Sequence, residues 1–467
     1  MIGIKSIGAY IPRYTLGPNT VGWNSPLNKA ICNFDEDSVT MAVAAGIDCI
    51  KGLDRSKIDA LIFATTSSPY TEKQGASTIA EALDLRKDIF TADVTGVLRA
   101  GTNALRSAID SVKAGSARSV LVLAADSRPT LPRSTLEQTT GDGAAALLIS
   151  DDKPSVEIEY SYFESEHMLD TWRPEGELFI RSAEDRFILE EGYQRILLES
   201  TKRFFNKFKL TPEKYSKAVY YAPDLRRHKS MGYKLGFNDE QIQDSYFGQL
   251  GNTGAAFALM LLIACLENAE ANQNIFLANY GDGADLFSFK TNAGIKRIRN
   301  GLGMKGHLES RLNIANYETY TRWRDIWTSE GAKRPTERMP SPSALWREKD
   351  ANIRLYGAKC KSCGYLQYPP QRICTKCSTL DQFENVRLSD KPATVFTYSM
   401  DYLAGTVDVP LVITVINFDD GGRMLTMMTD RELEEVHINM PVQMSFRKLR
   451  SAGGIHNYYW KTIPKRK

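Results

Sequence analysis

The spacing of apolar residues along the first part of the chain predicts alternating helices and strands. Residues 35–52 carry five apolar residues on one helical face: Val39, Ala42, Val43, Ile47 and Ile50. Residues 58–67 form a short, almost continuous apolar run, which is typical of a strand buried on both faces. The pattern continues with a helix over 98–114 and strands over 119–126 and 144–150.

The second half of this region repeats the same order. Its predicted elements are a helix over 191–208, a strand over 217–223, a helix over 252–268, and strands over 274–280 and 286–290. Matching glycine turns, "TGDG" and "YGDG", precede the last strand of each half, and neither has phosphate-loop spacing. Two similar halves favour a duplicated α/β unit over a single nucleotide-binding sheet.

The composition changes near position 331. Residues 331–345 contain three prolines among charged and small residues, which predicts a linker. Beyond it, evenly spaced alternating runs indicate a small β-barrel; they are "ATVFTYSMDY", "LVITVINFD", "RMLTMMT" and "VQMSFRKL".

Overall composition excludes several classes of protein. With 467 residues, 42% hydrophobic and 25% charged, the chain is expected to form more than one ordered domain. A net charge of +3 argues against nucleic-acid binding through bulk electrostatics, and the terminal "PKRK" is expected to be a solvated tail. The longest apolar segment, 255–266, is too short to span a membrane, and no signal peptide is recognisable, so we expect a cytoplasmic protein without membrane attachment.

Four of the seven cysteines are clustered with metal-ligand spacing. Cys360, Cys363, Cys374 and Cys377 form two CxxC pairs separated by ten residues. This arrangement predicts a tetrahedral Zn²⁺ site of structural type, since four thiolates leave no open position for substrate. The alternatives are redox-active thiols or a site that has lost its metal.

The remaining cysteines offer no clear nucleophile. Cys49 and Cys265 fall inside helical apolar patterns and are expected in the core, while Cys32 precedes a helix and has no activating neighbour in the sequence.

The C-terminal module resembles the zinc-ribbon and OB-fold domains that accompany thiolases and acyl-CoA enzymes. The resemblance rests on "RLYGAKCKSCGYLQYPPQRICTKC" and the strands behind it. It implies a zinc ribbon with a preceding helix over 346–385 and an OB-fold over 386–467. In that family the module binds a thiolase-fold partner and shapes acyl-CoA access.

Residues 1–330 resemble the thiolase superfamily, within it the archaeal and bacterial 3-hydroxy-3-methylglutaryl-CoA synthase branch. The matching stretches are "GIKSIGAYIPRY", "DEDSVTMAVAAG", "SSPY", "LRAGTNAL", "DTWRPEGE", "KLGF", "GNTGAA" and "NYETYTRWR". The resemblance implies an α/β thiolase fold with αβαβα layers and two halves, about 1–155 and 156–330. It also implies a CoA thioester substrate and a homodimer, with a further thiolase-fold or other enzyme subunit as a possible partner.

The family's chemistry uses a cysteine nucleophile, a histidine and a glutamate, and the matched positions hold other residues. The "ACxAGT" pattern reads "VLRAGT", which puts Leu98 at the cysteine position. "FHxP" reads "YYAP", which puts Tyr221 at the histidine position, and "GSES" reads "ATTS", which puts Thr66 at the glutamate position. Asn252 of "GNT" is retained. The resemblance thus implies no cysteine acyl-enzyme.

Three functions remain open on this reading. The first is aldol or retro-aldol chemistry on a CoA thioester, in which Tyr221 exchanges a proton or donates to an oxyanion and Asn252 supports the thioester oxygen. The second is a non-catalytic scaffold that pairs with an active thiolase-fold subunit. The third is a synthase-like acyltransferase in which one bound thioester attacks another without covalent storage.

Several further residues have both functional and purely structural interpretations. His167 lies just before a family segment that borders the pocket and is a candidate extra base; the alternative is a surface histidine. Arg226, Arg227 and Lys229 follow the Tyr221 strand and are candidates to meet CoA phosphates; the alternative is a solvated basic face. Tyr221 and Leu98 are alternatively plain pocket walls, and Thr66 a hydroxyl bonded to nearby backbone.

Overall fold

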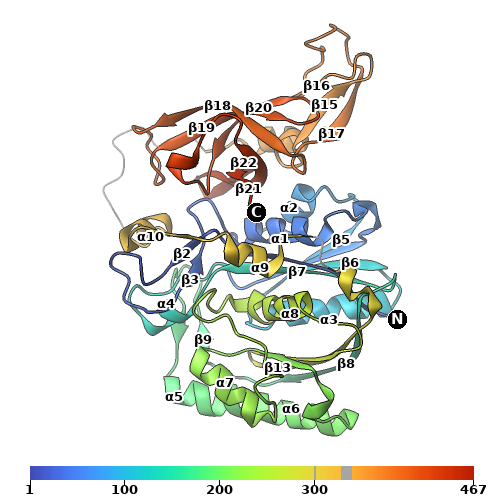
Figure 1. Ribbon diagram of the computed structural model, residues 1–467, viewed down its shortest axis with the longest axis vertical. Coiled ribbons are helices and arrows are strands. Elements are labelled where there is room, and N and C mark those ends of the chain that lie inside the picture. Colours follow the sequence, from blue (N-terminus) through green and yellow to red (C-terminus); the bar gives the residue numbers. More distant parts are fainter. Residues whose placement is uncertain (299–300, 328–338, 467) are drawn as a thin grey trace. The chain divides into compact units, whose positions relative to one another are not determined.

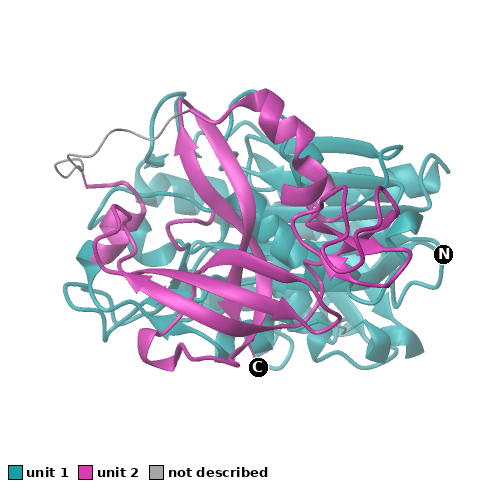
Figure 2. Cartoon of the chain, turned by 90° about the horizontal axis from the view of Figure 1, so that it is seen from above, with its two compact units in different colours: residues 1–32, 37–80, 85–318 teal, residues 33–36, 81–84, 319–467 magenta. Residues whose placement is uncertain are grey.

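A computed structural model describes residues 1–298, 301–327 and 339–466, and these residues group into two compact units. The first unit comprises residues 1–32, 37–80 and 85–318, and the second comprises residues 33–36, 81–84 and 319–467 (Figure 2). Of the predicted linker, residues 331–338 lie outside the described residues, and a short helix, α11 (Pro342–Arg347), begins within its last part.

The described residues of the first unit build a mixed, nine-stranded sheet in the order β11-β12-β13-β8-β1-β7-β6-β4-β5 (Figure 1). Its strands are β1 (Gly3–Tyr10), β4 (Ala60–Thr65), β5 (Phe90–Thr95), β6 (Ser119–Asp126), β7 (Gly143–Ser150), β8 (Val156–Ser165), β11 (Lys217–Tyr220), β12 (Asn274–Tyr280) and β13 (Gly283–Thr291). Apart from the edge strand β5 and the longer β8, these strands are almost wholly buried, which explains their continuous apolar runs.

The sheet consists of two halves with the same internal pairing. In one half β1 pairs antiparallel with β7, β7 antiparallel with β6, and β6 parallel with β4. In the other half β8, β13, β12 and β11 repeat those three relationships in the same order. The halves join where β1 and β8 pair over Gly3–Glu157 and Ile4–Val156. The predicted duplication is therefore confirmed in the strand order.

Helices lie between and outside the two halves of the sheet (Figure 1). They are α1 (Ser38–Ile50), α2 (Gly75–Ala82), α3 (Ala100–Lys113), α6 (Arg195–Phe208), α7 (Leu225–Lys234) and α8 (Phe257–Glu267). Helices α3 and α8 occupy the middle layer, α1 and α2 cover one outer face, and α6 and α7 cover the other, which gives the αβαβα order. Residues 257–266 of α8 are all buried, as a central helix with no polar face requires.

No helix in the described ranges is both long and apolar enough to cross a membrane.

The second unit contains a small three-stranded sheet and a closed barrel. The small sheet is formed by β15 (Tyr356–Cys360), β16 (Leu366–Gln367) and β17 (Phe383–Arg387). The barrel closes in the order β18-β19-β20-β22-β21; its strands are β18 (Ala393–Asp401), β19 (Leu411–Phe418), β20 (Arg423–Met428), β21 (Pro441–Ala452) and β22 (Ile455–Pro464). The alternating runs predicted the first four strands but not β22, which completes the barrel by pairing with β21 and β20.

The expectation of a solvated C-terminal tail is wrong for Arg466. Its side chain is buried, and its guanidinium lies 3.3 Å from the fully buried carboxylate of Asp430. Arg447, also buried, bridges Asp430 at 2.6 Å to Asp35 and Glu36 at 3.1 and 3.0 Å. Buried carboxylates need paired cations, and this demand draws the basic terminus inward.

Candidate active site

Leu98 lies in the turn between β5 and α3, where the sequence places it. Gly96 has a φ of +86°, which lets the chain reverse before the helix begins at Ala100. The side chain of Leu98 is buried and lies so close to Gly281 that a Cβ there would stand 2.9 Å from the Leu98 Cβ. An ion pair of 2.8 Å between Arg99 and Asp285 fixes the start of the helix. The helix therefore presents an aliphatic side chain at this turn.

Tyr221 and Asn252 meet directly. Tyr221 follows β11 and is buried, and its hydroxyl oxygen accepts a hydrogen bond of 3.1 Å from Asn252 Nδ2. The Asn252 Oδ1 accepts from the Gly254 amide at 3.0 Å, and its Nδ2 also donates to the Ala222 carbonyl at 3.4 Å, so the carboxamide is held at both ends. Burial raises the pKa of Tyr221 to about 12. The phenol therefore keeps its proton at neutral pH and can donate it to a ligand.

Two more buried tyrosines pack around Tyr221. Tyr193, from the π-helix Ile188–Gln194, and Tyr280, from the end of β12, lie with ring centroids 6.1 and 5.8 Å from that of Tyr221. Burial raises the pKa of both phenols. Among the described residues no group hydrogen-bonds to the Tyr193 hydroxyl. The three rings form an aromatic wall with protonated hydroxyl groups.

One cavity of about 140 Å³ brings Leu98, Tyr221 and Asn252 together. Tyr193 and Tyr280 also line it, and its wall further includes Arg128, Asp170, Asp185, Leu189 and Arg227. The cavity thus brings together Tyr221 and Asn252, two of the three residues predicted to be catalytic, and Leu98 as part of its wall.

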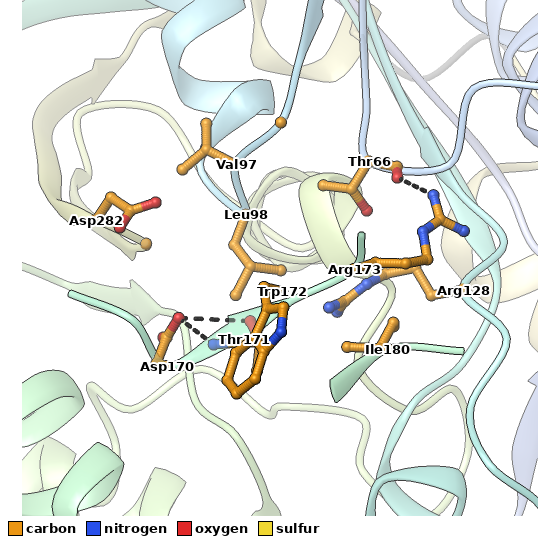
Figure 3. Close-up of a pocket in the computed structure, with 12 residues that line it drawn as sticks. Thr66, Val97, Leu98, Arg128, Asp170, Thr171, Trp172, Arg173, Ile180 and Asp282 are labelled. Carbon is orange, nitrogen blue, oxygen red and sulfur yellow. Dashed lines mark hydrogen bonds between the residues drawn. The ribbon is translucent and has the colours of Figure 1, made fainter. Parts of the chain in front are cut away.

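Leu98 also lines a neighbouring hollow of about 150 Å³ (Figure 3). It shares Leu98, Arg128 and Asp170 with the cavity and adds Thr66 to the wall. The Thr66 hydroxyl donates a hydrogen bond of 2.9 Å to Asp126, and its carbonyl accepts one of 2.8 Å from Arg173. Thr66 therefore lines the hollow while its hydroxyl is bonded within the protein.

Asp126 connects the two loops that form this region. Its carboxylate is fully buried and accepts hydrogen bonds from the Thr65, Thr66 and Ser67 hydroxyls and from the amides of Thr66 and Ala255. These donors come from the end of β4 and the loop after it, and from the loop that carries Asn252. Asp126 is thus a positioning residue that holds the second loop, and with it Asn252, against the end of the sheet.

The other predicted site residues lie elsewhere. His167 is exposed and lines neither the cavity nor the hollow. Lys229 is exposed and pairs with Asp239 at 3.2 Å. Arg226 lines a third, surface depression together with Arg186 and Arg227.

Sequence reasoning missed Asp170 and Arg128. Asp170 is buried, accepts a hydrogen bond of 2.5 Å from the Thr171 amide, and has its pKa raised by burial. It opens the quoted segment "DTWRPEGE", only three residues after His167. Arg128 follows β6, whose end lies beside the end of the parallel strand β4. The sequence signal that could have identified both residues is their position at the ends of loops near the edge of the sheet.

The four clustered cysteines form a site of the right size for zinc. Their sulfur atoms all lie within 4.8 Å of one another, with 3.6 Å between Cys360 and Cys377 and between Cys363 and Cys374. Tetrahedral ligands at the usual Zn–S distance are roughly 3.8 Å apart. The donor set and its spacing therefore fit a zinc ribbon.

Comparisons with known proteins agree with this architecture. Residues 347–381 match the family described as ChsH2, rubredoxin-like zinc ribbon domain, and residues 385–447 match ChsH2, C-terminal OB-fold domain. A crystal structure of HMG-CoA synthase complexed with CoA superposes with a TM-score of 0.63 at 21% identity, covering 73% of this chain and 95% of that one.

Curated relatives extend the match over the first unit. The hydroxymethylglutaryl-CoA synthase of Pyrococcus horikoshii is 30% identical over 337 residues, which are 69% of this chain and 96% of the relative. That of Methanobrevibacter smithii is 30% identical over 341 residues, which are 69% of this chain and 99% of the relative. By its sequence and its thiolase-like fold, the chain belongs to the hydroxymethylglutaryl-CoA synthase family, with a zinc ribbon and an OB-fold behind the shared region.

Proposed function

We propose that this protein acts on a CoA thioester and makes or breaks a carbon–carbon bond by aldol-type chemistry, without a covalent acyl-enzyme. The observation that carries the proposal is the protonated Tyr221 hydroxyl, oriented by Asn252, in a cavity where Leu98 occupies the helix-start turn. None of the described residues lining this cavity is a cysteine. A synthase relative and a related structure that holds CoA support the choice of thioester.

The surface depression provides a mouth for the CoA nucleotide. It is lined by Arg186, Arg226 and Arg227, and it shares Asp185, Leu189 and Arg227 with the inner cavity. Guanidinium groups bind phosphates through paired hydrogen bonds. CoA phosphates held at this mouth would let the pantetheine arm reach inward toward Leu98. Arg226 and Arg227 keep their predicted role in this proposal, and Arg186 takes the place of Lys229.

In the cleavage direction, Asp170 and Tyr221 divide the proton movements. The Asp170 carboxylate takes the proton of the substrate's β-hydroxyl group, the Cα–Cβ bond breaks, and its electron pair forms the thioester enolate. Tyr221 donates its hydrogen bond to the enolate oxygen, and the proton on Asp170 then passes to Cα. The products are a carbonyl compound and a shorter acyl-CoA. Asn252 acts as a positioning residue for Tyr221, since both of its amide hydrogens are already directed at protein oxygens.

In the zinc ribbon, Cys360, Cys363, Cys374 and Cys377 would hold one Zn²⁺ with no open position. When bound, the metal supplies cross-linking of the ribbon and no catalytic step.

Kinetics on the purified full chain test the proposal. A panel of 3-hydroxyacyl-CoA thioesters is incubated with the protein, and the shorter acyl-CoA is quantified by chromatography. We expect turnover that falls roughly 100-fold or more in Tyr221→Phe. Tyr233→Phe, which removes a partly exposed hydroxyl bonded to Asp239 and outside both cavities, is the matched control and should retain full activity.

Two results would contradict the aldol proposal. Full activity in Tyr221→Phe would remove the phenol from the mechanism. Turnover that appears only after addition of a cysteine-bearing thiolase-fold subunit would favour the scaffold function instead.

A further inference from the structure

We propose that Glu137 is a positioning residue, which acts on Tyr221 through the short helix α4 and Asn252. Helix α4 (Thr135–Thr139) forms part of the cavity wall. The inference deepens the proposed function and rests on it, since it concerns the placement of the Tyr221 hydroxyl. It is carried by a fully buried carboxylate that does not itself line the cavity.

Helix α4 has one side on the cavity and another side packed inside the protein. Leu136 and Thr139 line the cavity together with the following Thr140. Glu137 lies on the same helix, but its side chain is fully buried and points away from this wall. With five residues, α4 is too short to be stable alone, because isolated helices need roughly 12 residues or more in water. The position of α4 therefore depends on its contacts with the rest of the first unit.

The Glu137 carboxylate accepts hydrogen bonds from two donors. The Tyr317 hydroxyl donates to Oε1 at 2.8 Å and lies 3.0 Å from Oε2, and the Arg133 amide donates to Oε2 at 2.7 Å. Burial and the hydrogen bond to Glu137 raise the pKa of Tyr317, so the phenol keeps its proton and remains a donor. Both carboxylate oxygens are therefore in use.

Lys29 holds the backbone of α4 as well. Its buried ammonium group donates to the Glu137 carbonyl at 2.6 Å. Carbonyl groups in the last turn of a helix have no partner within the helix, and this bond satisfies one of them. The next residue, Ala30, donates its amide to the Leu250 carbonyl at 2.9 Å. Adjacent residues of one strand thus hold both α4 and the loop that follows Leu250.

The C-terminal end of α4 holds the backbone of Asn252. The Asn252 amide donates to the Thr139 carbonyl at 2.7 Å, and the Gly141 amide donates to the Asn252 carbonyl at 2.9 Å. The two segments lie so close that a Cβ at Gly141 would stand 2.0 Å from the Leu250 carbonyl oxygen. The Asn252 side chain in turn donates to the Tyr221 hydroxyl at 3.1 Å. A displacement of α4 would therefore move the group that orients the phenol.

A carboxylate at this position fits a positioning role better than a space-filling role. Burying a carboxylate is far less favourable than burying an apolar side chain of similar size, and only well-placed hydrogen bonds offset the difference. The same bonds fix α4 in one place, because each donor has its own acceptor oxygen. Glutamine has nearly the same shape but only one such oxygen, so its amide group would face one of the donors. Glu137→Gln is therefore expected to loosen α4 without leaving a cavity in the core.

Two measurements on the full chain test this assignment. Hydrogen exchange followed by mass spectrometry reports on the backbone link. The Asn252 and Gly141 amides should exchange about 10-fold faster in Glu137→Gln, while exchange in the core helix α8 stays unchanged. Steady-state kinetics with the best 3-hydroxyacyl-CoA report on the consequence. The kcat should fall about 10-fold, with less than about a 2-fold change in KM.

A double-mutant cycle separates positioning from a general loss of stability. If Glu137 acts through the Tyr221 hydroxyl, Glu137→Gln should lower kcat by less than about 2-fold in a Tyr221→Phe background. A merely structural role would lower kcat equally in both backgrounds.

Tyr317→Phe is the second variant, because it removes one donor from the same carboxylate and leaves the charge in place. It also keeps the aromatic ring, which stacks on Trp23 with ring centroids 5.9 Å apart. This variant should lower kcat and speed the exchange of Asn252 in the same way, so it decides the question even if Glu137→Gln fails to fold.

Glu164→Gln is the matched control. Glu164 also accepts a tyrosine hydroxyl, that of Tyr162 at 2.5 Å, but it belongs to β8 and lines neither the cavity nor the hollow. Its replacement should leave both kcat and the exchange of Asn252 unchanged.

Four results would overturn the inference. Unchanged exchange at Asn252 and Gly141 in both variants would show that the carboxylate does not hold this loop. Faster exchange with an unchanged kcat would remove Glu137 from the reaction and leave the proposed function standing. An equal loss of kcat in the native and Tyr221→Phe backgrounds would reduce Glu137 to a general effect on the fold. Native protein that cleaves no 3-hydroxyacyl-CoA would remove the proposed function together with this inference.

Discussion

The Asn252 amide donates to the Tyr221 hydroxyl oxygen at 3.1 Å, which leaves the phenolic hydrogen available to a ligand. An aspartate in place of Asn252 would reverse this polarity, since a carboxylate accepts the phenolic hydrogen. We therefore expect Asn252→Asp to lower kcat at least 10-fold with a smaller change in KM. Steady-state kinetics with the best 3-hydroxyacyl-CoA measure both constants.

Asn252→Ser provides the contrast, because a serine hydroxyl can still donate to Tyr221. If Asn252→Asp and Asn252→Ser reduce kcat equally, the direction of this hydrogen bond has no influence on the reaction.

Replacement of Asp170 should abolish the acid limb of the rate profile. Burial holds the pKa of Asp170 above its ordinary value of 3.8, and only the carboxylate can accept the hydroxyl proton. The rate should therefore fall as the pH decreases through a pKa above 3.8. Asp170→Asn should lose roughly 100-fold or more in kcat, whereas Asp170→Glu should keep an acid limb. A native profile that stays flat down to the pH of acid unfolding would argue against Asp170 as the base.

Tyr221 should make the stability of the folded protein decrease at alkaline pH. Its pKa is about 12 in the folded protein, whereas an unfolded tyrosine titrates near 10, so the folded state binds the phenolic proton more tightly. The contribution is complete below about pH 10 and decreases at about 1.4 kcal/mol per pH unit between the two pKa values. Thermal melts from pH 8 to 11 should therefore show native protein losing stability relative to Tyr221→Phe. A difference that is constant with pH would contradict the shifted pKa.

Zinc should bind in a one-to-one ratio with the chain and should stabilise the fold. Elemental analysis of the full chain is expected to give one zinc per chain, bound by Cys360, Cys363, Cys374 and Cys377. Cys363→Ser should lower the zinc content and the melting temperature of the ribbon and barrel. The kcat of the proposed reaction at Tyr221 should stay unchanged. Cys265→Ser, which alters a buried core thiol in α8, is the control and should keep its zinc. A zinc-free native protein with an unchanged melting temperature would contradict the site.

The local pattern of apolar and polar residues predicted the helices and strands well, because burial of apolar side chains determines these elements in both units. Strands 119–126 and 274–280 have the predicted bounds, and α1 and α3 lie inside their predicted ranges. The strand β22 was missed because its polar positions, such as Lys461 and Thr462, are buried inside the second unit. Such burial depends on partners far along the chain, here Asp35 for Lys461 at 2.8 Å.

The candidate site was only partly predictable. The motif positions identified Leu98, Tyr221 and Asn252, and the structure gathers all three in one cavity. Asp170 and Arg128 could not be selected from the sequence, because their significance comes from burial and from their place in the cavity wall. These properties are tertiary, and no local pattern of residue types encodes them.

The second unit draws on three separate stretches of the chain, and this limits how the protein can be divided. Residues 33–36 and 81–84 lie early in the sequence, yet their carboxylates bind Arg447 and Arg354 of the same unit. A protein truncated near position 330 would retain Asp35, Glu36 and Glu81 without their guanidinium partners. Loss or replacement of the zinc-ribbon and barrel module during evolution would therefore need compensating substitutions at these early positions. This requirement makes it hard to separate the two units once they are fused.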